Sequence, residues 1–249
     1  MKKYKNISDA KSNSDSNKKD KIKKKIEEKL KDYELTINLI TKSCVEINKK
    51  FNFSKNNTDG RIDSAVLESE YLENLKLLLE QNNKKVVIPV ARNWYDIEIN
   101  DIPFNLKLTD GTSCDNVFNK LGILYSITGT SKHKKNLNNK DFLSIIKKTE
   151  DWKKNRNIAT EYHFLVIFKS EPENILLKSI FDIKQYKTNP SNTLQINWKN
   201  EFENIEYKMK DDEIFNKIKE LLKTIQKSYK QKFDDYLDYV NYDFDKIKI

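Results

Sequence analysis

The stretch that decides the fold is Trp94–Leu108, which reads WYDIEINDIPFNLKL. Successive side chains of a β-strand point to opposite faces, so the first part of this stretch separates its residues into two sets. Ile97 and Ile99 fall on one face, and Asp96 and Glu98 fall on the other. The alternation predicts a strand with one face toward an apolar core and two carboxylates on its other face.

A second strand, Phe104–Leu108, follows with the same alternation, and its polar residues are Asn105 and Lys107. Asn100–Pro103 between the two strands is typical of a tight turn. Symmetrical closure of this hairpin places Asp96 opposite Lys107. Carboxylates that hold a hard cation beside a lysine that orients water or phosphate are what metal-assisted phosphodiester hydrolysis requires. The alternative is a cross-strand salt bridge on a solvated sheet face.

The length and composition of the chain indicate its domain organisation and the kind of partner it binds. The 249 residues predict one domain with a sizeable core, and the net charge of +9 with a pI near 9.1 favours a polyanionic partner. Only three of the 47 basic residues are arginines, so the lysine excess is also what a coding bias toward A and T produces. Four glycines and no glycine-rich loop argue against a nucleotide-cradling motif.

The location of the protein is also constrained by its sequence. No apolar run is long enough for a membrane helix, and the first residues lack the apolar segment of a secretory signal. Cys44 and Cys114 lie far apart in unlike contexts, so neither a disulfide framework nor a zinc site is expected. These features predict a cytoplasmic protein with no membrane contact.

The periodicity of apolar residues predicts an α/β (α+β) fold, with a central mixed β-sheet flanked by helices and with long helices near both ends. Residues 1–20 are expected to form a disordered basic tail, and 21–249 a single domain. The expected helices are 21–50, 63–81, 115–125, 142–154 and 211–239. Beyond the hairpin, the expected strands are 86–90, 162–168 and 193–198, and 173–181 is expected to be a short helix or a turn-rich stretch.

Glu68 lies within the predicted helix 63–81. A helical projection places it among the leucines of the apolar sector, whereas Glu70 and Glu73 fall outside that sector. A buried glutamate is unfavourable unless a metal ion or a cation binds it. Glu68 is therefore expected to face the hairpin; the alternative is a position at the edge of the sector, with the carboxylate in water.

Glu68, Asp96 and then Asn105-Leu106-Lys107 resemble, in order and spacing, the PD-(D/E)xK nuclease superfamily, and type II restriction endonucleases in particular. The resemblance covers about residues 60–130, the expected catalytic core, with 131–249 as the DNA-recognition and helical part. Two positions depart from the family pattern. Tyr95 stands where the family has proline, and Asn105 stands where it has aspartate or glutamate.

The resemblance implies a restriction-endonuclease-like fold and hydrolysis of phosphodiester bonds with Mg²⁺ as the cofactor. The implied catalytic residues are Glu68, Asp96, Asn105 and Lys107, with Lys107 orienting the attacking water. The implied metal ligands are Asp96, the carbonyl of Leu106, and Glu68 or Glu98 in place of the acid missing at Asn105.

DNA contacts are expected from three segments. Thr112, Ser113, Asp115 and Asn116 follow the lysine strand and are expected near the cut, and Lys132, Lys134 and Lys135 are expected along the phosphates. Gln195 and Asn197 share a face in an extended strand, and their amides suit adenine edges. The alternative for this last pair is a solvated strand face.

The function expected from this resemblance is that of a type II site-specific deoxyribonuclease acting on double-stranded DNA. Such an enzyme implies a homodimer with two-fold symmetry, for which helices 22–50 and 211–239 are candidate dimer or DNA-clamp elements. It also implies a cognate DNA methyltransferase in the host that is not a physical partner. The alternatives are a non-catalytic basic nucleic-acid-binding or structural protein, and a repair or recombination nuclease of the same fold.

Overall fold

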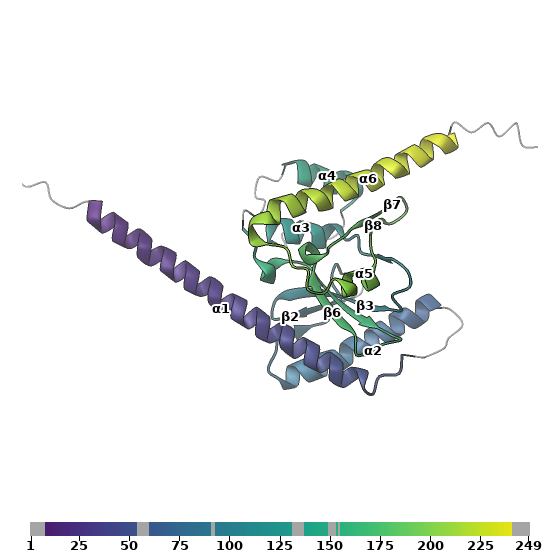
Figure 1. Cartoon of the computed structure of the whole chain (residues 1–249), viewed down its shortest axis with the longest axis horizontal. Helices are drawn as coiled ribbons and strands as arrows, with labels where there is room; N and C mark the ends of the chain where they lie inside the picture. Colours follow the sequence, from purple (N-terminus) through teal and green to yellow (C-terminus); the bar gives the residue numbers. More distant parts are fainter. Residues whose placement is uncertain are drawn as a thin grey trace, which may run out of the picture.

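The computed structural model describes residues 8–53, 60–90, 93–130, 137–148, 153 and 155–240. Two sheets and several helices make up this part of the chain (Figure 1). The helices are α1 (Ser8–Asn48), α2 (Gly60–Gln81), α3 (Lys120–Thr128), α4 (Asn139–Lys148), α5 (Trp198–Glu203) and α6 (Ile214–Val240). The strands are β1 (Val86–Val87), β2 (Ile97–Ile99), β3 (Ile102–Thr109), β4 (Asp115–Asn116), β5 (His163–Phe168), β6 (Ile175–Ser179), β7 (Lys187–Asn189) and β8 (Thr193–Ile196).

The larger sheet is mixed, as the sequence predicts. Its strand order is β1-β2-β3-β5-β6, and all neighbours are antiparallel except β3 and β5, which run parallel. All six residues of β5 are buried, so its continuous apolar run fits a central strand covered on both faces. The smaller sheet has the order β4-β8-β7 and is antiparallel throughout.

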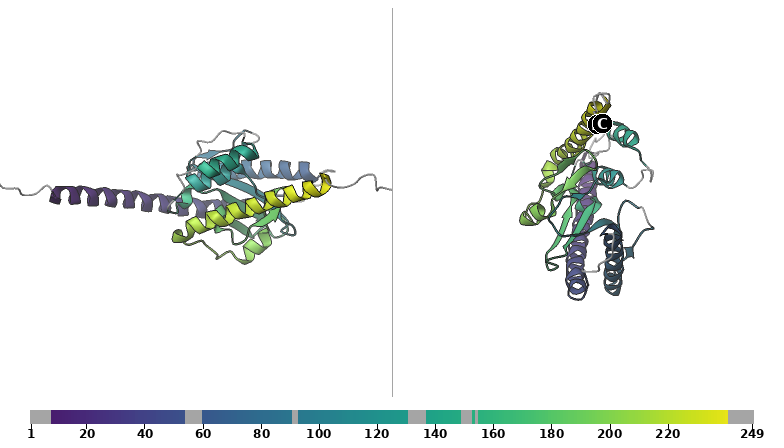
Figure 2. Two further views of the ribbon diagram at one scale, coloured as in Figure 1. Left: turned by 90° about the horizontal axis from the view of Figure 1, so that it is seen from above. Right: turned by 90° about the vertical axis from the view of Figure 1, so that its right-hand side faces the viewer.

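Helices cover both faces of the larger sheet. One apolar cluster joins α1 and α2 to the sheet through β2, β3 and alternate residues of β5. The other cluster joins the opposite face to α3, β8, α5 and α6. The ends of α1 and α6 extend past the sheets on opposite sides, as the left view in Figure 2 also shows. None of the helices in the described ranges combines the length and apolarity that a membrane span requires.

The hairpin closes with a shorter turn than the symmetrical closure predicted. Asn100 and Asp101 have φ angles of 50° and 64°, so both central residues of a two-residue turn are left-handed. Ile102 and Pro103 therefore belong to β3, and Ile97 pairs with Phe104. The predicted pairing was wrong by two residues, and Asp96 does not lie directly opposite Lys107.

Other boundaries also differ from the predictions. Asp115–Asn116 is a strand rather than the start of a helix, because Asn119 caps α3 by accepting hydrogen bonds from the N–H groups of Leu121 and Gly122. Ile175–Ser179 is strand β6, because it pairs with β5 along its whole length. Trp198 lies in α5 rather than in the preceding strand.

The N-terminal helix is longer than its apolar pattern predicted. It begins at Ser8, so much of the segment expected to be disordered is helical. Extending an existing helix adds one hydrogen bond per residue and needs no new nucleus, which allows a polar stretch to continue it. Helix α4 ends at Lys148, and the rest of its predicted extent, apart from Lys153, lies outside the described residues.

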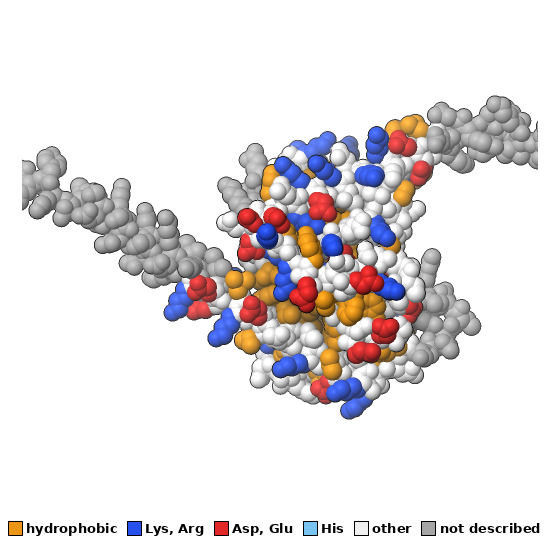
Figure 3. All heavy atoms as spheres, viewed as in Figure 1, with side chains coloured by type: hydrophobic (Ala, Val, Ile, Leu, Met, Phe, Trp, Pro, Cys, Tyr) orange, Lys and Arg blue, Asp and Glu red, His pale blue; other side chains and the backbone are white. Residues whose placement is uncertain are grey.

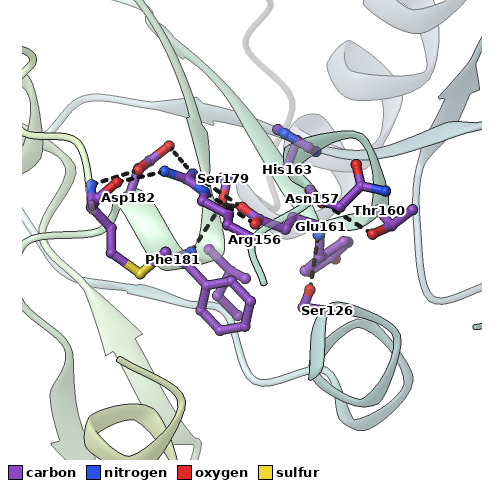
Figure 4. A network of polar contacts seen from close by, with 12 residues as sticks. Ser126, Arg156, Asn157, Thr160, Glu161, His163, Ser179, Phe181 and Asp182 are labelled. Carbon is purple, nitrogen blue, oxygen red and sulfur yellow. Dashed lines mark hydrogen bonds and ion pairs between the residues drawn. The ribbon is translucent and has the colours of Figure 1, made fainter. Parts of the chain in front are cut away.

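A buried ionic network holds the edge of the larger sheet (Figure 4). The Arg156 guanidinium donates to Glu161 at 3.2 Å, to Asp182 Oδ2 at 2.7 Å and to the Met209 carbonyl at 2.8 Å. Ser179 donates to Glu161, and Asp182 Oδ1 accepts from the N–H of Met209 at 2.9 Å. Each buried charge thus has direct partners, which is the condition under which such groups are tolerated.

Candidate active site

Asp96 lies immediately before β2, where its backbone N–H donates to the carbonyl of Phe104 at 2.9 Å. Its carboxylate accepts two hydrogen bonds from β3. Asn105 Nδ2 donates to Asp96 Oδ2 at 2.6 Å, and the backbone N–H of Leu106 donates to the same oxygen at 2.9 Å. The hairpin therefore fixes the orientation of this carboxylate. Burial raises the pKa of Asp96, although Lys107 and these hydrogen bonds oppose the shift.

Asn105 stands where the nuclease family has an acid, and in this structure its side chain is a hydrogen-bond partner of Asp96. Its amide is a hydrogen-bond donor to Asp96, and an amide donor can hold a carboxylate where a second acid would repel it. A catalytic role for Asn105 remains a prediction, as does the metal-binding role of the Leu106 carbonyl.

Glu68 lies on α2 and interacts electrostatically with Asp96 and Lys107 of the hairpin. It is half-buried, and burial raises the pKa of its carboxyl. Lys107 opposes this shift, whereas Asp96 and Asp115 reinforce it. Glu70, two residues farther along α2, is exposed. These interactions show that Glu68 lies within electrostatic reach of the hairpin carboxylate and lysine.

Asp115 is the third carboxylate of this cluster, and the sequence predicted for it only a contact to DNA. Strand β4 pairs Asp115 with Ile196, which is fully buried. Asp115 Oδ2 is itself buried and has no hydrogen-bond partner. Burial raises the pKa of Asp115, and side-chain hydrogen bonding to Thr109 and Trp198 and the charge of Lys107 oppose the shift. No local pattern in the sequence signals this position, because β4 reaches the cluster only through the tertiary fold.

Lys107 is the common electrostatic partner of the cluster, which we define as Glu68, Asp96, Asp115 and Lys107. It opposes the upward pKa shift of each of the three acids. Among the described residues, however, the ion pairs within 4.0 Å do not include Lys107. Lys169, at the end of β5, acts on Glu68 and Asp115 in the same sense. The ammonium thus faces three carboxylates without direct contact to any of them.

Glu98 occupies a different environment. Its pKa is raised by burial and by Asp101, and Lys85 and Tyr95 oppose the shift. These groups lie on or beside the hairpin, and Asp101 is part of its turn. The groups that shift the pKa of Glu68 and Asp96 do not include Glu98. Glu98 thus interacts with groups near the turn, whereas Glu68 interacts with Asp96 and Lys107, and the choice between the two acids stays a prediction.

The cluster suits Mg²⁺ in its donor chemistry. Mg²⁺ prefers oxygen ligands and commonly takes only one or two carboxylates, with water and phosphate completing its shell. In the described ranges, however, no three His, Cys, Asp or Glu residues lie so that together they could hold a metal ion, so one or two of these acids at most would bind it. Burial disfavours the charged form of all three acids, and a bound cation would favour it again; Oδ2 of Asp115 has no hydrogen-bond partner that would compete for this role.

The expected DNA-contact residues fall into separate groups. Thr112 and Ser113 are exposed on the loop after β3. Asn116 is exposed and accepts a hydrogen bond from Gln195 at 2.8 Å. Asn197 caps α5 by accepting from the N–H of Asn200 at 2.9 Å, so it does not extend the strand face of Gln195 as predicted. Lys132, Lys134 and Lys135 lie outside the described residues.

The face of the molecule in Figure 3 shows basic and acidic side chains interspersed, with hydrophobic side chains between them. No continuous basic strip stands out in that view. The net charge of +9 therefore does not mark this face as a nucleic-acid surface.

Comparison of the chain with protein-family models, with curated proteins and with solved structures gave no significant match. The functional argument accordingly rests on the cluster.

Proposed function

We propose that the protein is a Mg²⁺-dependent endonuclease that hydrolyses phosphodiester bonds of double-stranded DNA, in the manner of a type II restriction enzyme. The observation that carries this proposal is that Lys107 acts electrostatically on three carboxyl groups from different elements, one of which, Asp96, β3 holds by two hydrogen bonds. They come from α2, from the residue before β2 and from β4, and Lys107 acts electrostatically on all three. Carboxyl groups whose pKa is raised by burial beside a specific charged partner are typical of functional sites.

A bound Mg²⁺ would polarise the scissile phosphate and stabilise the charge that develops on the leaving oxygen. Asp96 would hold the ion with the oxygen not occupied by Asn105 and Leu106, and either Glu68 or Asp115 would supply a further oxygen. Lys107 would hold the attacking water or a phosphate oxygen between its ammonium and the carboxylates. The bonds from β3 keep Asp96 in a fixed orientation, which limits reorganisation during the reaction.

The decisive experiment compares matched pairs of acids in a cleavage assay on plasmid and phage DNA, with and without Mg²⁺. Glu68→Gln should abolish formation of discrete fragments, and Glu70→Gln should not, because Glu70 is exposed on the same helix. Asp96→Asn should likewise abolish cleavage, and Glu98→Gln should not. DNA binding without any Mg²⁺-dependent cleavage by the wild-type protein would favour the non-catalytic alternative instead.

The dimeric state, the cytoplasmic location and the sequence specificity belong to the same proposal. Symmetrical cutting of a palindromic site requires two active sites related by a two-fold axis. Analytical ultracentrifugation of the protein with and without duplex DNA tests this part separately, and a monomer that cuts both strands would refute it.

A further inference from the structure

The outer face of the smaller sheet carries a row of three polar residues from three strands. Asn116 of β4 pairs with Gln195 of β8, and Lys187 of β7 pairs with the same Gln195. Residues that pair across antiparallel strands lie on the same face. Asn116, Gln195 and Lys187, which we call the amide row, therefore form one line across the sheet.

The two faces of this sheet differ in character. Leu194 and Ile196, the neighbours of Gln195 along β8, are fully buried in the core. Asn116 is exposed, and Gln195 and Lys187 are only half-buried. Packing therefore explains the inner face, whereas nothing in the core requires two amides and a lysine to be aligned on the outer one.

The amides of the row orient each other. Gln195 Nε2 donates to Asn116 Oδ1 at 2.8 Å. This contact leaves Gln195 Oε1 as an acceptor and Asn116 Nδ2 as a donor at adjacent positions. A donor beside an acceptor is the pattern that matches the N7 and N6 edge of adenine in the major groove, and preorientation reduces the entropy lost on binding.

We propose that Asn116 and Gln195 read base edges in the major groove of duplex DNA, and that Lys187 contacts a neighbouring phosphate. The inference takes duplex DNA as the substrate from the proposed function. The two amides lie on the adjacent strands β4 and β8, and the major groove admits a two-stranded ribbon, whereas Lys187 lies on the third strand, β7. The row offers amides and a positive charge, with no acid among its three residues. Asn116 directly follows Asp115, so the row adjoins the cluster along the chain.

The experiment measures binding rather than cleavage, in the absence of divalent ions. A pool of duplexes with a random central segment is incubated with the wild-type protein, and the bound fraction is sequenced. Wild-type protein should enrich a defined sequence. Asn116→Ala and Gln195→Ala should each weaken binding to that sequence by about 5- to 150-fold, with little change for random duplex. Asn82→Ala, an exposed amide after α2, is the matched control and should keep the preference.

Lys187→Ala should weaken binding to all duplexes alike and reduce the salt slope of the association constant by about one. The inference is overturned if the wild-type protein enriches no sequence, or if the double variant Asn116→Ala/Gln195→Ala enriches the same one while its melting temperature equals that of the wild type. Selective binding by a wild-type protein that never cuts DNA with Mg²⁺ would refute the proposed function and leave this inference intact.

Discussion

Replacing Asp96 with asparagine and with alanine separates the chemical role of this carboxylate from its structural role. The fully buried Leu106 donates its backbone N–H to Asp96 Oδ2 at 2.9 Å, and half-buried Asn105 donates at 2.6 Å. Alanine removes the acceptor of both donors. A buried N–H without an acceptor costs about 1–3 kcal/mol, and Asn105 adds less because its amide can turn toward water. Asp96→Ala should therefore lower the free energy of unfolding by about 2–4 kcal/mol.

Asparagine at the same position keeps an acceptor oxygen and removes the charge. Because burial already disfavours the charged form of Asp96, the neutral amide should change the free energy of unfolding by less than about 1 kcal/mol. Both variants should fail to cleave DNA with Mg²⁺. Urea denaturation and a plasmid cleavage assay measure the two effects. Cleavage by Asp96→Asn at the wild-type rate would refute the catalytic reasoning, and wild-type stability of Asp96→Ala would refute the structural reasoning.

Three further predictions concern the Arg156 network, the pH dependence of stability and the binding of Mg²⁺. Arg156→Met should lower the free energy of unfolding by about 3–5 kcal/mol, since it leaves two buried carboxylates without their partner. Urea denaturation measures this change. The control Lys85→Met, at an exposed ion pair, should leave the free energy of unfolding unchanged. Burial raises the pKa of Glu68, Asp96 and Asp115, so the folded state keeps protons that the unfolded chain releases. The free energy of unfolding should therefore fall as the pH rises above the ordinary carboxyl range near 4, and fall less in a variant with all three acids replaced by amides; parallel pH curves would contradict this. Mg²⁺ at 100 times its dissociation constant should stabilise the wild-type protein by about 2.7 kcal/mol, and thermal melts of Asp96→Asn should show a much smaller effect.

The hairpin shows which features a local sequence pattern can predict and which it cannot. Alternation placed Ile97 and Ile99 in the core correctly, because the period of a strand is fixed by its backbone. Register depends instead on the turn, and the prediction assigned four residues to it where the chain uses two. Asn100 and Asp101 are residue types that tolerate positive φ, so a two-residue turn was an available reading of the same sequence.

The candidate site was predictable to the extent that it depends on local periodicity. The position of Glu68 follows from the turn of a helix, and that prediction agrees with the electrostatic reach of its carboxylate toward Lys107. Asp115 could not be found this way, because β4 has only two residues and its place depends on pairing with β8, which lies far along the chain. Strand β6 was missed for the same reason, since its pairing with β5 decides its structure.

The buried Arg156 network and the half-buried cluster differ in how their charges are compensated, and this contrast bears on function. In the Arg156 network, Glu161 and Asp182 contact the guanidinium directly and accept further hydrogen bonds. In the cluster, Asp96 accepts two hydrogen bonds from β3, but burial still raises the pKa of all three acids, and the ion pairs of the described residues do not join any of them to Lys107. A fold selected for stability alone would pair these acids or replace them, because uncompensated charge is costly to bury. Three acids kept around one lysine are what an active site requires when the acids bind a cation and the lysine binds a phosphate. For this reason the functional proposal rests on the cluster, and the Arg156 network gives a prediction about stability.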